Sequence, residues 1–226
     1  MATITKTNKT KKMVTVAMFC ALAYICVFIF RFKVSFLTFD VKDAVITMGA
    51  MFCGPLTAPL ISFIVALIEM ITVSDTELYG MIMNFLSSAT FSFTASLIYK
   101  YRRSINGAII GLFASVAAVT AVMMAANLVI TPFYMHVTVA EVGALIPTLL
   151  LPFNFTKALF NMALVLLLYK PVSNALKKSR LVEKESAAYN FDIKSVLTLC
   201  LGAVLLVVSL LIFILVLKGE ISIFRS

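Results

Sequence analysis

The chain has 226 residues, of which 62% are hydrophobic and only 13% are charged, and its mean hydropathy is +1.07. This composition excludes an ordinary soluble domain, because several apolar stretches reach the roughly 18 residues that a membrane-spanning helix needs. The net charge of +9 comes largely from basic clusters beside those stretches, at residues 6–12, 100–103 and 170–184. Such clusters are typical of the cytoplasmic flanks of membrane helices, and they argue against nucleic-acid binding.

The apolar stretches predict six membrane spans followed by a seventh. We expect the six at residues 13–30, 41–53, 56–73, 80–99, 106–130 and 146–169, and the seventh at 195–217. Gly54-Pro55 ends the second span, which is short for a bilayer and begins with the charged residues Lys42 and Asp43. The fifth is expected to end at Thr131-Pro132. The predicted fold class is an all-α integral membrane protein, a six-helix bundle with a seventh C-terminal transmembrane helix.

The positions of lysine and arginine predict the orientation and the division of the chain. The amino terminus and residues 100–103 and 170–194 are expected in the cytoplasm, because they are basic. The outer loops are then residues 31–42, 74–79 and 135–141, and Asp40 and Asp43 are counted with the outer acidic groups. The expected divisions are a basic amino terminus (1–12), a six-helix domain (13–170), a cytoplasmic linker (171–194), the extra helix (195–217) and a tail (218–226). The first span lacks a convincing signal-peptidase site, so we expect it to be retained.

The most informative side chain is Lys157, which lies within the sixth predicted span. A charged group near the middle of a bilayer is costly unless it faces a partner or a wet cavity, so it indicates a functional site. Asn154 and Asn161 lie on the same helical face, one turn before and one turn after it. This polar stripe on an apolar helix predicts one wall of a binding site.

Two more asparagines extend the predicted site. Asn84 lies in the fourth span, and Asn127 lies near the outer end of the fifth, at a depth similar to that of Asn154 and Lys157. Amides in an apolar setting need partners, and together these groups predict an outward-facing pocket with a mostly apolar lining. For Asn127 the alternative is a polar cap on a helix that breaks at Pro132.

Other polar or small residues in the spans have structural interpretations. Ser87 and Ser88 indicate close helix packing. For Glu69 we favour an interfacial carboxylate that snorkels toward the acidic loop, with a ligand or cation contact as the alternative. Ala17 and Ala21 form a small-x3-small surface for close helix–helix contact, which can equally be ordinary packing within the protein.

No sequence pattern indicates catalysis or metal binding. The chain has no phosphate-binding loop, no His-Glu-x2-His motif and no Gly-x-Ser-x-Gly motif. Its four cysteines include no Cys-x2-Cys pair, and its single histidine, His136, lies in a predicted loop. We therefore expect a protein that binds a ligand with no catalytic site, metal or cofactor, and that does not itself hydrolyse ATP.

Several segments together resemble the substrate-binding S components of energy-coupling factor (ECF) vitamin transporters, and most closely the riboflavin-specific ones. The similarity spans about residues 10–175, and its most specific element is Pro152-Phe-Asn-Phe-Thr-Lys157. The other segments that carry it are Phe36-Leu-Thr-Phe-Asp-Val-Lys-Asp43, Phe52-Cys-Gly-Pro-Leu56, Met83-Asn-Phe-Leu-Ser-Ser-Ala89 and Asn127 with Pro132-Phe-Tyr134.

The resemblance implies a multi-pass protein of a prokaryotic cell membrane that binds riboflavin from outside. Family members work with a transmembrane T component and two cytoplasmic ATPases, and they deliver the vitamin by toppling in the membrane. The positions that resemble flavin-binding residues are Asn127, Asn154 and Lys157. The positions that resemble a lid over the ligand are Leu37, Thr38 and Phe39. The positions that resemble the contact with the T component are Ala17 and Ala21.

Riboflavin also suits the composition, because 19 phenylalanines and 12 methionines can line a flat apolar slot for its ring system. The alternatives within the family are S components for pantothenate, a queuosine precursor or thiamin, and the absence of tryptophan weighs against thiamin. Two further alternatives are a small membrane enzyme and a scaffold protein. An enzyme would need acid–base or metal residues, and a scaffold would leave the polar stripe around Lys157 unexplained.

Overall fold

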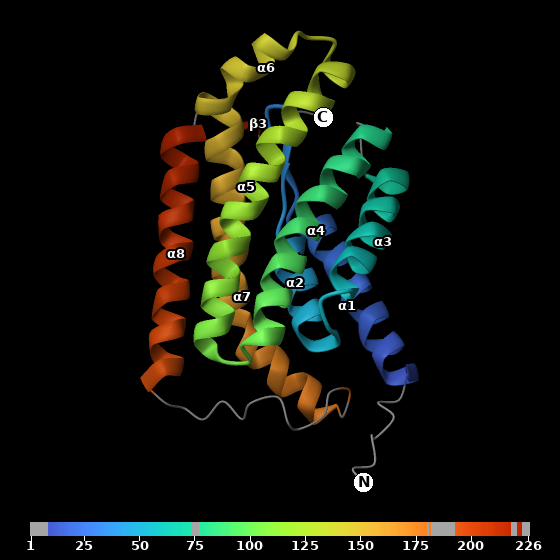
Figure 1. The fold of residues 1–226 in the computed structure, drawn as a ribbon, viewed down its shortest axis with the longest axis vertical. Coiled ribbons are helices and arrows are strands. Elements are labelled where there is room, and N and C mark those ends of the chain that lie inside the picture. The colour runs from blue at the N-terminus through green and yellow to red at the C-terminus, as the bar shows by residue number, and fades with distance from the viewer. Residues whose placement is uncertain (1–8, 74–76, 180, 182–192, 218–220, 223–226) are drawn as a thin grey trace.

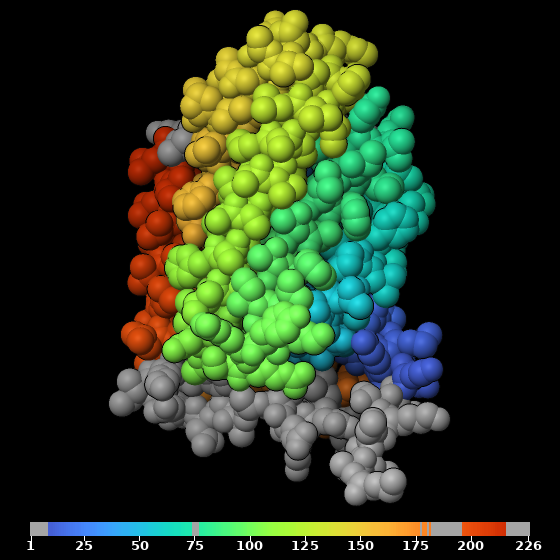
Figure 2. Space-filling view, in the orientation of Figure 1, coloured from blue at the N-terminus to red at the C-terminus, as the bar shows by residue number. Residues whose placement is uncertain are grey.

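The computed structural model describes residues 9–73, 77–179, 181, 193–217 and 221–222, which form a bundle of helices around a short β-hairpin (Figure 1). Its elements are α1 (Lys9–Ile29), β1 (Phe32–Val34), β2 (Leu37–Phe39), α2 (Lys42–Cys53), α3 (Thr57–Thr72), α4 (Glu77–Tyr101), α5 (Ile105–Met135), α6 (Val139–Leu145), a π-helical turn (Ile146–Leu150), α7 (Leu151–Lys178), α8 (Ile193–Leu217) and β3 (Ile221–Ser222). The space-filling view shows one body, elongated along the helix axes (Figure 2).

Within the described residues, five helical stretches are long and apolar enough to cross a membrane. They are α1, α4, α5, the stretch from α6 through α7, and α8. α3 has 16 residues and α2 only 12, which at about 1.5 Å per residue makes α2 about 18 Å long. The predicted membrane bundle with a seventh, C-terminal helix is confirmed, and α2 alone is too short for a hydrocarbon core of about 30 Å.

A β-hairpin occupies part of the segment at 31–42 that we predicted to be an outer loop. β1 and β2 pair in antiparallel register, with Phe32 opposite Phe39 and Val34 opposite Leu37. Ser35 lies in the tight turn between them and has a positive φ of 53°. The hairpin runs inside the bundle above α2 (Figure 1), and β3 pairs with its outer strand. The hairpin and α2 together therefore fill the centre of the bundle, which α2 alone is too short to do.

Two helices continue past the points at which we expected them to end. α5 passes through Pro132 and ends at Met135, before His136 with its left-handed φ of 55°. α7 passes through Pro171 and ends at Lys178, within the stretch that we predicted to be a linker. Inside a membrane bundle, neighbouring helices and hydroxyl side chains can satisfy the carbonyls that a proline leaves without a partner. The prediction that α5 breaks at Pro132 was therefore wrong.

The connection between α5 and α7 contains a short helix instead of the predicted loop at 135–141. α6 begins with a capping box, in which the Thr138 hydroxyl accepts from the backbone N–H of Glu141 and the Glu141 carboxylate accepts from the N–H of Thr138. The π-helical turn follows directly and leads into α7, with Pro152 as the second residue of that helix.

α8 packs along α7, on the opposite side of the bundle from α1 and α3 (Figure 1). Gly202 permits the close approach, because a Cβ at this position would lie 3.2 Å from Cβ of Leu166 and 3.1 Å from Cγ of Leu167. Ser209, two turns later on the same face, is fully buried. The extra helix is therefore an integral part of the bundle.

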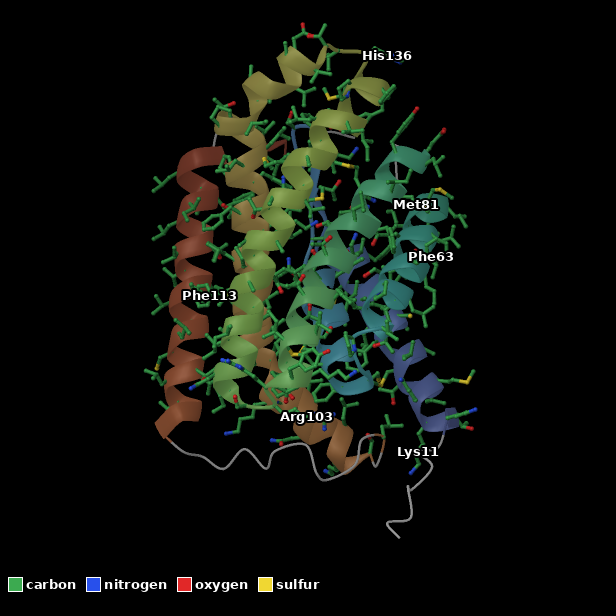
Figure 3. All side chains as sticks on the ribbon, in the orientation of Figure 1. Lys11, Phe63, Met81, Arg103, Phe113 and His136 are labelled. Carbon is green, nitrogen blue, oxygen red and sulfur yellow. The ribbon has the colours of Figure 1, made fainter. Side chains whose placement is uncertain are left out.

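Two of the segments that we predicted to be cytoplasmic lie at the same end of the bundle. Lys11 and Arg103 lie at one end, near the start of α1 and the connection between α4 and α5 (Figure 3). His136 lies at the other end, where α5 leads into α6 (Figure 3). We refer to these as the basic end and the hairpin end.

Candidate ligand-binding site

A cavity opens toward the hairpin end of the bundle, between the hairpin, α4, α5 and α7. Its empty volume is about 620 Å³, open solvent at its entrance included. The lining mixes apolar and aromatic side chains with almost as much polar surface, so it is more polar than the mostly apolar pocket that the sequence predicted. The described residues that line it are Arg31, Phe36, Leu37, Thr38, Tyr79, Gly80, Met83, Asn84, Ser87, Met123, Tyr134, Phe153, Asn154 and Lys157.

Three aromatic side chains surround the entrance of the cavity, and we call them the aromatic cover. Phe36 comes from the hairpin, Tyr79 from the start of α4 and Tyr134 from the end of α5. The ring centroids of Phe36 and Tyr134 are 6.3 Å apart, and those of Tyr79 and Tyr134 are 6.1 Å apart. These distances are within the range of favourable aromatic pairs. The cover joins three separate elements at the entrance.

The polar wall of the cavity lies in the first turns of α7. Asn154 and Lys157 are both buried, each with 6% of its surface exposed, and both line the cavity. The amide of Asn154 donates to the carbonyl of Leu150 in the preceding π-helical turn, at 2.8 Å. π-Helical turns are rare and occur often at functional sites. The pair that the sequence singled out therefore lies side by side on one wall.

Lys157 is paired with groups at the end of the hairpin. Its Nζ donates to Oδ2 of Asp40 at 2.8 Å and to the carbonyl oxygen of Thr38 at 3.3 Å. Asp40, which is 1% exposed, directly follows the hairpin. This contact therefore ties α7 to the end of β2, and it places the Lys157 ammonium beside the hairpin segment that lines the cavity.

A second buried ion pair continues from Asp40 to the opposite wall. Nζ of Lys42 lies 3.5 Å from Oδ2 of Asp40 and 2.7 Å from Oε2 of Glu69 in α3. The same Glu69 oxygen accepts from the amide of Asn84 at 2.9 Å. The chain of contacts from Lys157 through Asp40, Lys42 and Glu69 to Asn84, which we call the buried ion chain, thus connects the two polar walls of the cavity.

Further hydrogen bonds fix the start of α2 against its neighbours. Asp43 accepts from the Ser88 hydroxyl at 2.5 Å, so the carboxylate in the first turn of α2 is satisfied by α4. The side-chain oxygen Oδ1 of Asn161 accepts from the backbone N–H of Ala44 at 2.9 Å. Its side-chain amide nitrogen Nδ2 donates to the backbone carbonyl of Asp40 at 3.2 Å. Asn161 therefore belongs to the polar stripe of α7 but supports the helix terminus behind the cavity.

Two predictions about charge are wrong. Glu69 does not snorkel to the surface but is 4% exposed and paired with Lys42. Asp40, Lys42 and Asp43 lie in the interior of the bundle, not in a solvated outer loop. Burial of an unpaired charge is costly, so the carboxylate of Glu69 and the ammonium of Lys42 each indicated a partner elsewhere in the chain. The pairing of the two follows only from the fold.

Some of the remaining candidate residues line the cavity and others do not. Asn84, Leu37 and Thr38 line it together with Asn154 and Lys157. Asn127 and Phe39 fall outside the set of described residues that line it.

The amide of Asn127 bonds within α5. It donates to the carbonyl of Met123 at 2.7 Å, and its oxygen accepts from the Thr131 hydroxyl at 2.9 Å. Phe39 packs against the rings of Phe153 and Phe160 behind the hairpin. A ligand would reach these two residues only after side chains or the hairpin move.

The arrangement supports binding of a ligand with hydrogen-bond acceptors and an apolar body. No group of three or more metal-binding side chains occurs among the residues that the structure describes. The charged residues in the lining are Arg31 and Lys157, while the carboxylates of the buried ion chain lie behind it. Arg31 donates to the carbonyl of Val73 at the end of α3. The cavity therefore presents donors from α4, α7 and Arg31 around an aromatic and methionine-rich space.

Comparison with known proteins gives consistent matches. A family model described as the substrate-specific component of ECF transporters matches residues 11–173. The riboflavin transporter RibU of Staphylococcus aureus (strain TCH60) is 29% identical over 181 residues, which cover 76% of this chain and 95% of that protein. A solved structure of the S component of a bacterial ECF transporter superposes with a TM-score of 0.65 at 27% identity, covering 75% of this chain and 99% of that one.

Proposed function

The chain belongs to the family of ECF transporter substrate-specific components, and from this premise we propose that it is the riboflavin-binding subunit of an ECF importer. The observation that carries the proposal is that Asn154 and Lys157 lie together on one wall of a cavity that the hairpin and aromatic side chains also line. The similarity to RibU over most of both chains supports the same ligand.

The chemistry of the cavity favours riboflavin over other vitamins. The isoalloxazine ring is flat and largely apolar, and Met83, Met123 and Phe153 can contact its faces. Its carbonyls and ring nitrogens accept hydrogen bonds, and the ammonium of Lys157 and the amide of Asn154 are suitable donors.

The net charge of the vitamin distinguishes riboflavin from pantothenate and thiamin. The ammonium of Lys157 is already neutralised by Asp40, so an anion such as pantothenate would find no unbalanced positive charge on that wall. A cation such as thiamin would face the guanidinium of Arg31, with no carboxylate among the described lining residues to pair with it. A neutral ligand needs neither an unbalanced ammonium on the α7 wall nor a carboxylate in the lining, and like charges in a partly desolvated site repel strongly.

Direct titration tests the ligand assignment. We expect the purified protein to quench riboflavin fluorescence, because Tyr79 and Tyr134 line the cavity and can quench a bound flavin. The titration should give a submicromolar dissociation constant. The chain has no tryptophan, so the fluorescence of the flavin is the better signal. Pantothenate and thiamin are the competitors to test. Binding of either one in place of riboflavin would contradict the assignment and leave the family membership intact.

For transport, we propose that the bundle lies with its basic end in the cytoplasm and docks through α1 on a T component that works with two ATPases. Ala17 and Ala21 lie on the exposed face of α1, among large apolar side chains such as Leu22 and Ile25. α8 packs on the far side of the bundle and leaves this face open (Figure 1). The positive-inside rule supports the orientation.

Bulky residues on this face should block transport without affecting binding. For Ala17→Leu and Ala21→Leu we expect riboflavin uptake, in cells that also express the T component and ATPases, to fall about tenfold or more, because close helix contacts need small side chains. Riboflavin affinity in detergent should stay within about twofold, since α1 does not line the cavity. The matched control is Ala203→Leu on the exposed face of α8. Unchanged uptake in both α1 variants would exclude this face as the docking surface.

A further inference from the structure

The C-terminal part of the chain contacts the hairpin directly. β3 extends the hairpin to three strands in the order β2-β1-β3, with Lys33 opposite Ser222 and Val34 opposite Ile221. The edge of β1 that would otherwise present unpaired backbone groups is therefore covered by the end of the chain.

α8 adds a side-chain contact to this backbone pairing. The ring of Phe213 lies 5.4 Å from that of Phe32 in β1 and 5.2 Å from that of Phe39 in β2, both in edge-to-face geometry. Phe32 and Phe39 also stack on each other, with centroids 4.9 Å apart. Phe213 therefore clamps a pair of rings that bridges the two strands. Since α8 is fixed on α7 through Gly202, the contact holds the hairpin to α7.

The rings in these contacts lie outside the set of described residues that line the cavity. Phe36, Leu37 and Thr38 of the same hairpin do line it, and Phe36 belongs to the aromatic cover. A ligand that is bound between the hairpin and α7 can leave more easily if the hairpin moves outward. α8 and β3 lie beyond residues 11–173, which match the family model, so this support is additional to the matched region.

We propose that α8 and β3 form a strap that holds the hairpin over the ligand cavity and slows ligand release, with Phe213 as the residue that positions the hairpin. The inference rests on the proposed ligand cavity, but it also predicts a property of the ligand-free protein. Without the strap, the hairpin would be held by the Lys157–Asp40 ion pair and by the ring contacts of Phe36 and Phe39 with α5 and α7.

The first test removes the clamp. For Phe213→Ala we expect riboflavin to dissociate about tenfold faster, because two aromatic pairs are lost, with a smaller change in the association rate. The control is Leu215→Ala on the same helix, where the side chain is 75% exposed. Hydrogen exchange of the amides at 32–39, measured without ligand, should accelerate in Phe213→Ala only.

The second test strengthens the strap and leaves Phe213 in place. Opposite residues in antiparallel strands have Cα atoms about 4.5–5.5 Å apart, which a disulfide can bridge. We expect Lys33→Cys combined with Ser222→Cys, in a Cys200→Ser background, to slow riboflavin release about tenfold when oxidised and to restore the normal rate on reduction. This arm keeps the inference testable if Phe213→Ala does not fold.

The outcomes distinguish the strap from the ligand assignment. If the wild-type protein does not bind riboflavin, the proposed ligand fails, and the hydrogen-exchange comparison still decides whether Phe213 holds the hairpin. If riboflavin binds but neither the release rate nor the exchange at 32–39 changes in Phe213→Ala, and the cross-link has no effect, the strap is excluded.

Discussion

Lys157→Met should weaken riboflavin binding by about 10- to 100-fold. A hydrogen bond to a charged donor contributes about 1.5–3 kcal/mol, and about 1.4 kcal/mol corresponds to a factor of ten in affinity. The same ammonium also donates to the Thr38 carbonyl on the hairpin, so its removal loosens a second wall of the cavity. The measurement is a riboflavin titration of the purified variant.

This substitution also leaves a buried carboxylate without its closest partner. Asp40 would keep only Lys42, at 3.5 Å, and breaking a buried ion pair can cost about 3–5 kcal/mol of stability. A loss of affinity in the single variant would therefore have two explanations. Thermal unfolding of the ligand-free protein separates them, because only the structural effect lowers the melting temperature without ligand.

The double variant Asp40→Asn/Lys157→Met is the matched control. It removes both charges of the pair and should recover most of the stability that the single variant loses. Its affinity for riboflavin should stay as low as that of Lys157→Met, because the donor to the ligand is still absent. Recovery of both stability and affinity would show that Lys157 acts only through the fold.

The spans and the polar stripe were predictable from the sequence because both depend on local patterns. Apolar length identifies a membrane helix, and Asn154, Lys157 and Asn161 share a helical face whatever the rest of the fold does. The pattern could not show which of them faces the cavity. Asn161 lies on the stripe but bonds to the start of α2, a contact between residues more than a hundred positions apart.

The partners of the buried charges Glu69 and Lys42 were also not predictable, because each partner lies far away in the sequence. Glu69 and Lys42 each require a neutralising contact, but their sequence separation of 27 residues allows many arrangements. The hairpin was missed because its strands are three residues long, too short for an alternation of apolar and polar residues to be recognised. The contact between the hairpin and β3 depends on residues at opposite ends of the chain, so it too required the fold.

The buried ion chain leads to the second large effect, which concerns stability. Glu69→Ala would leave the ammonium of Lys42 in the interior with Asp40 as its remaining partner, at 3.5 Å. The expected loss is about 3–5 kcal/mol, large compared with the usual total stability of a domain. Thermal unfolding in detergent, without ligand, measures it. Ser62→Ala in the same helix, also buried but outside the ion chain, is the control and should lose much less.

A double variant that removes both Lys42 and Glu69 tests whether their ion pair only stabilises the fold or also positions a group in the ligand site. Lys42→Met/Glu69→Leu replaces the pair by apolar side chains, so most of the stability should return. The amide of Asn84 would still lack the carboxylate that holds it at 2.9 Å, and we expect riboflavin affinity to remain several-fold lower. If affinity returns together with stability, the ion chain only fills the interior. If affinity stays low in the stable variant, Glu69 orients Asn84 toward the ligand, and the cost of burying these charges has a functional reason.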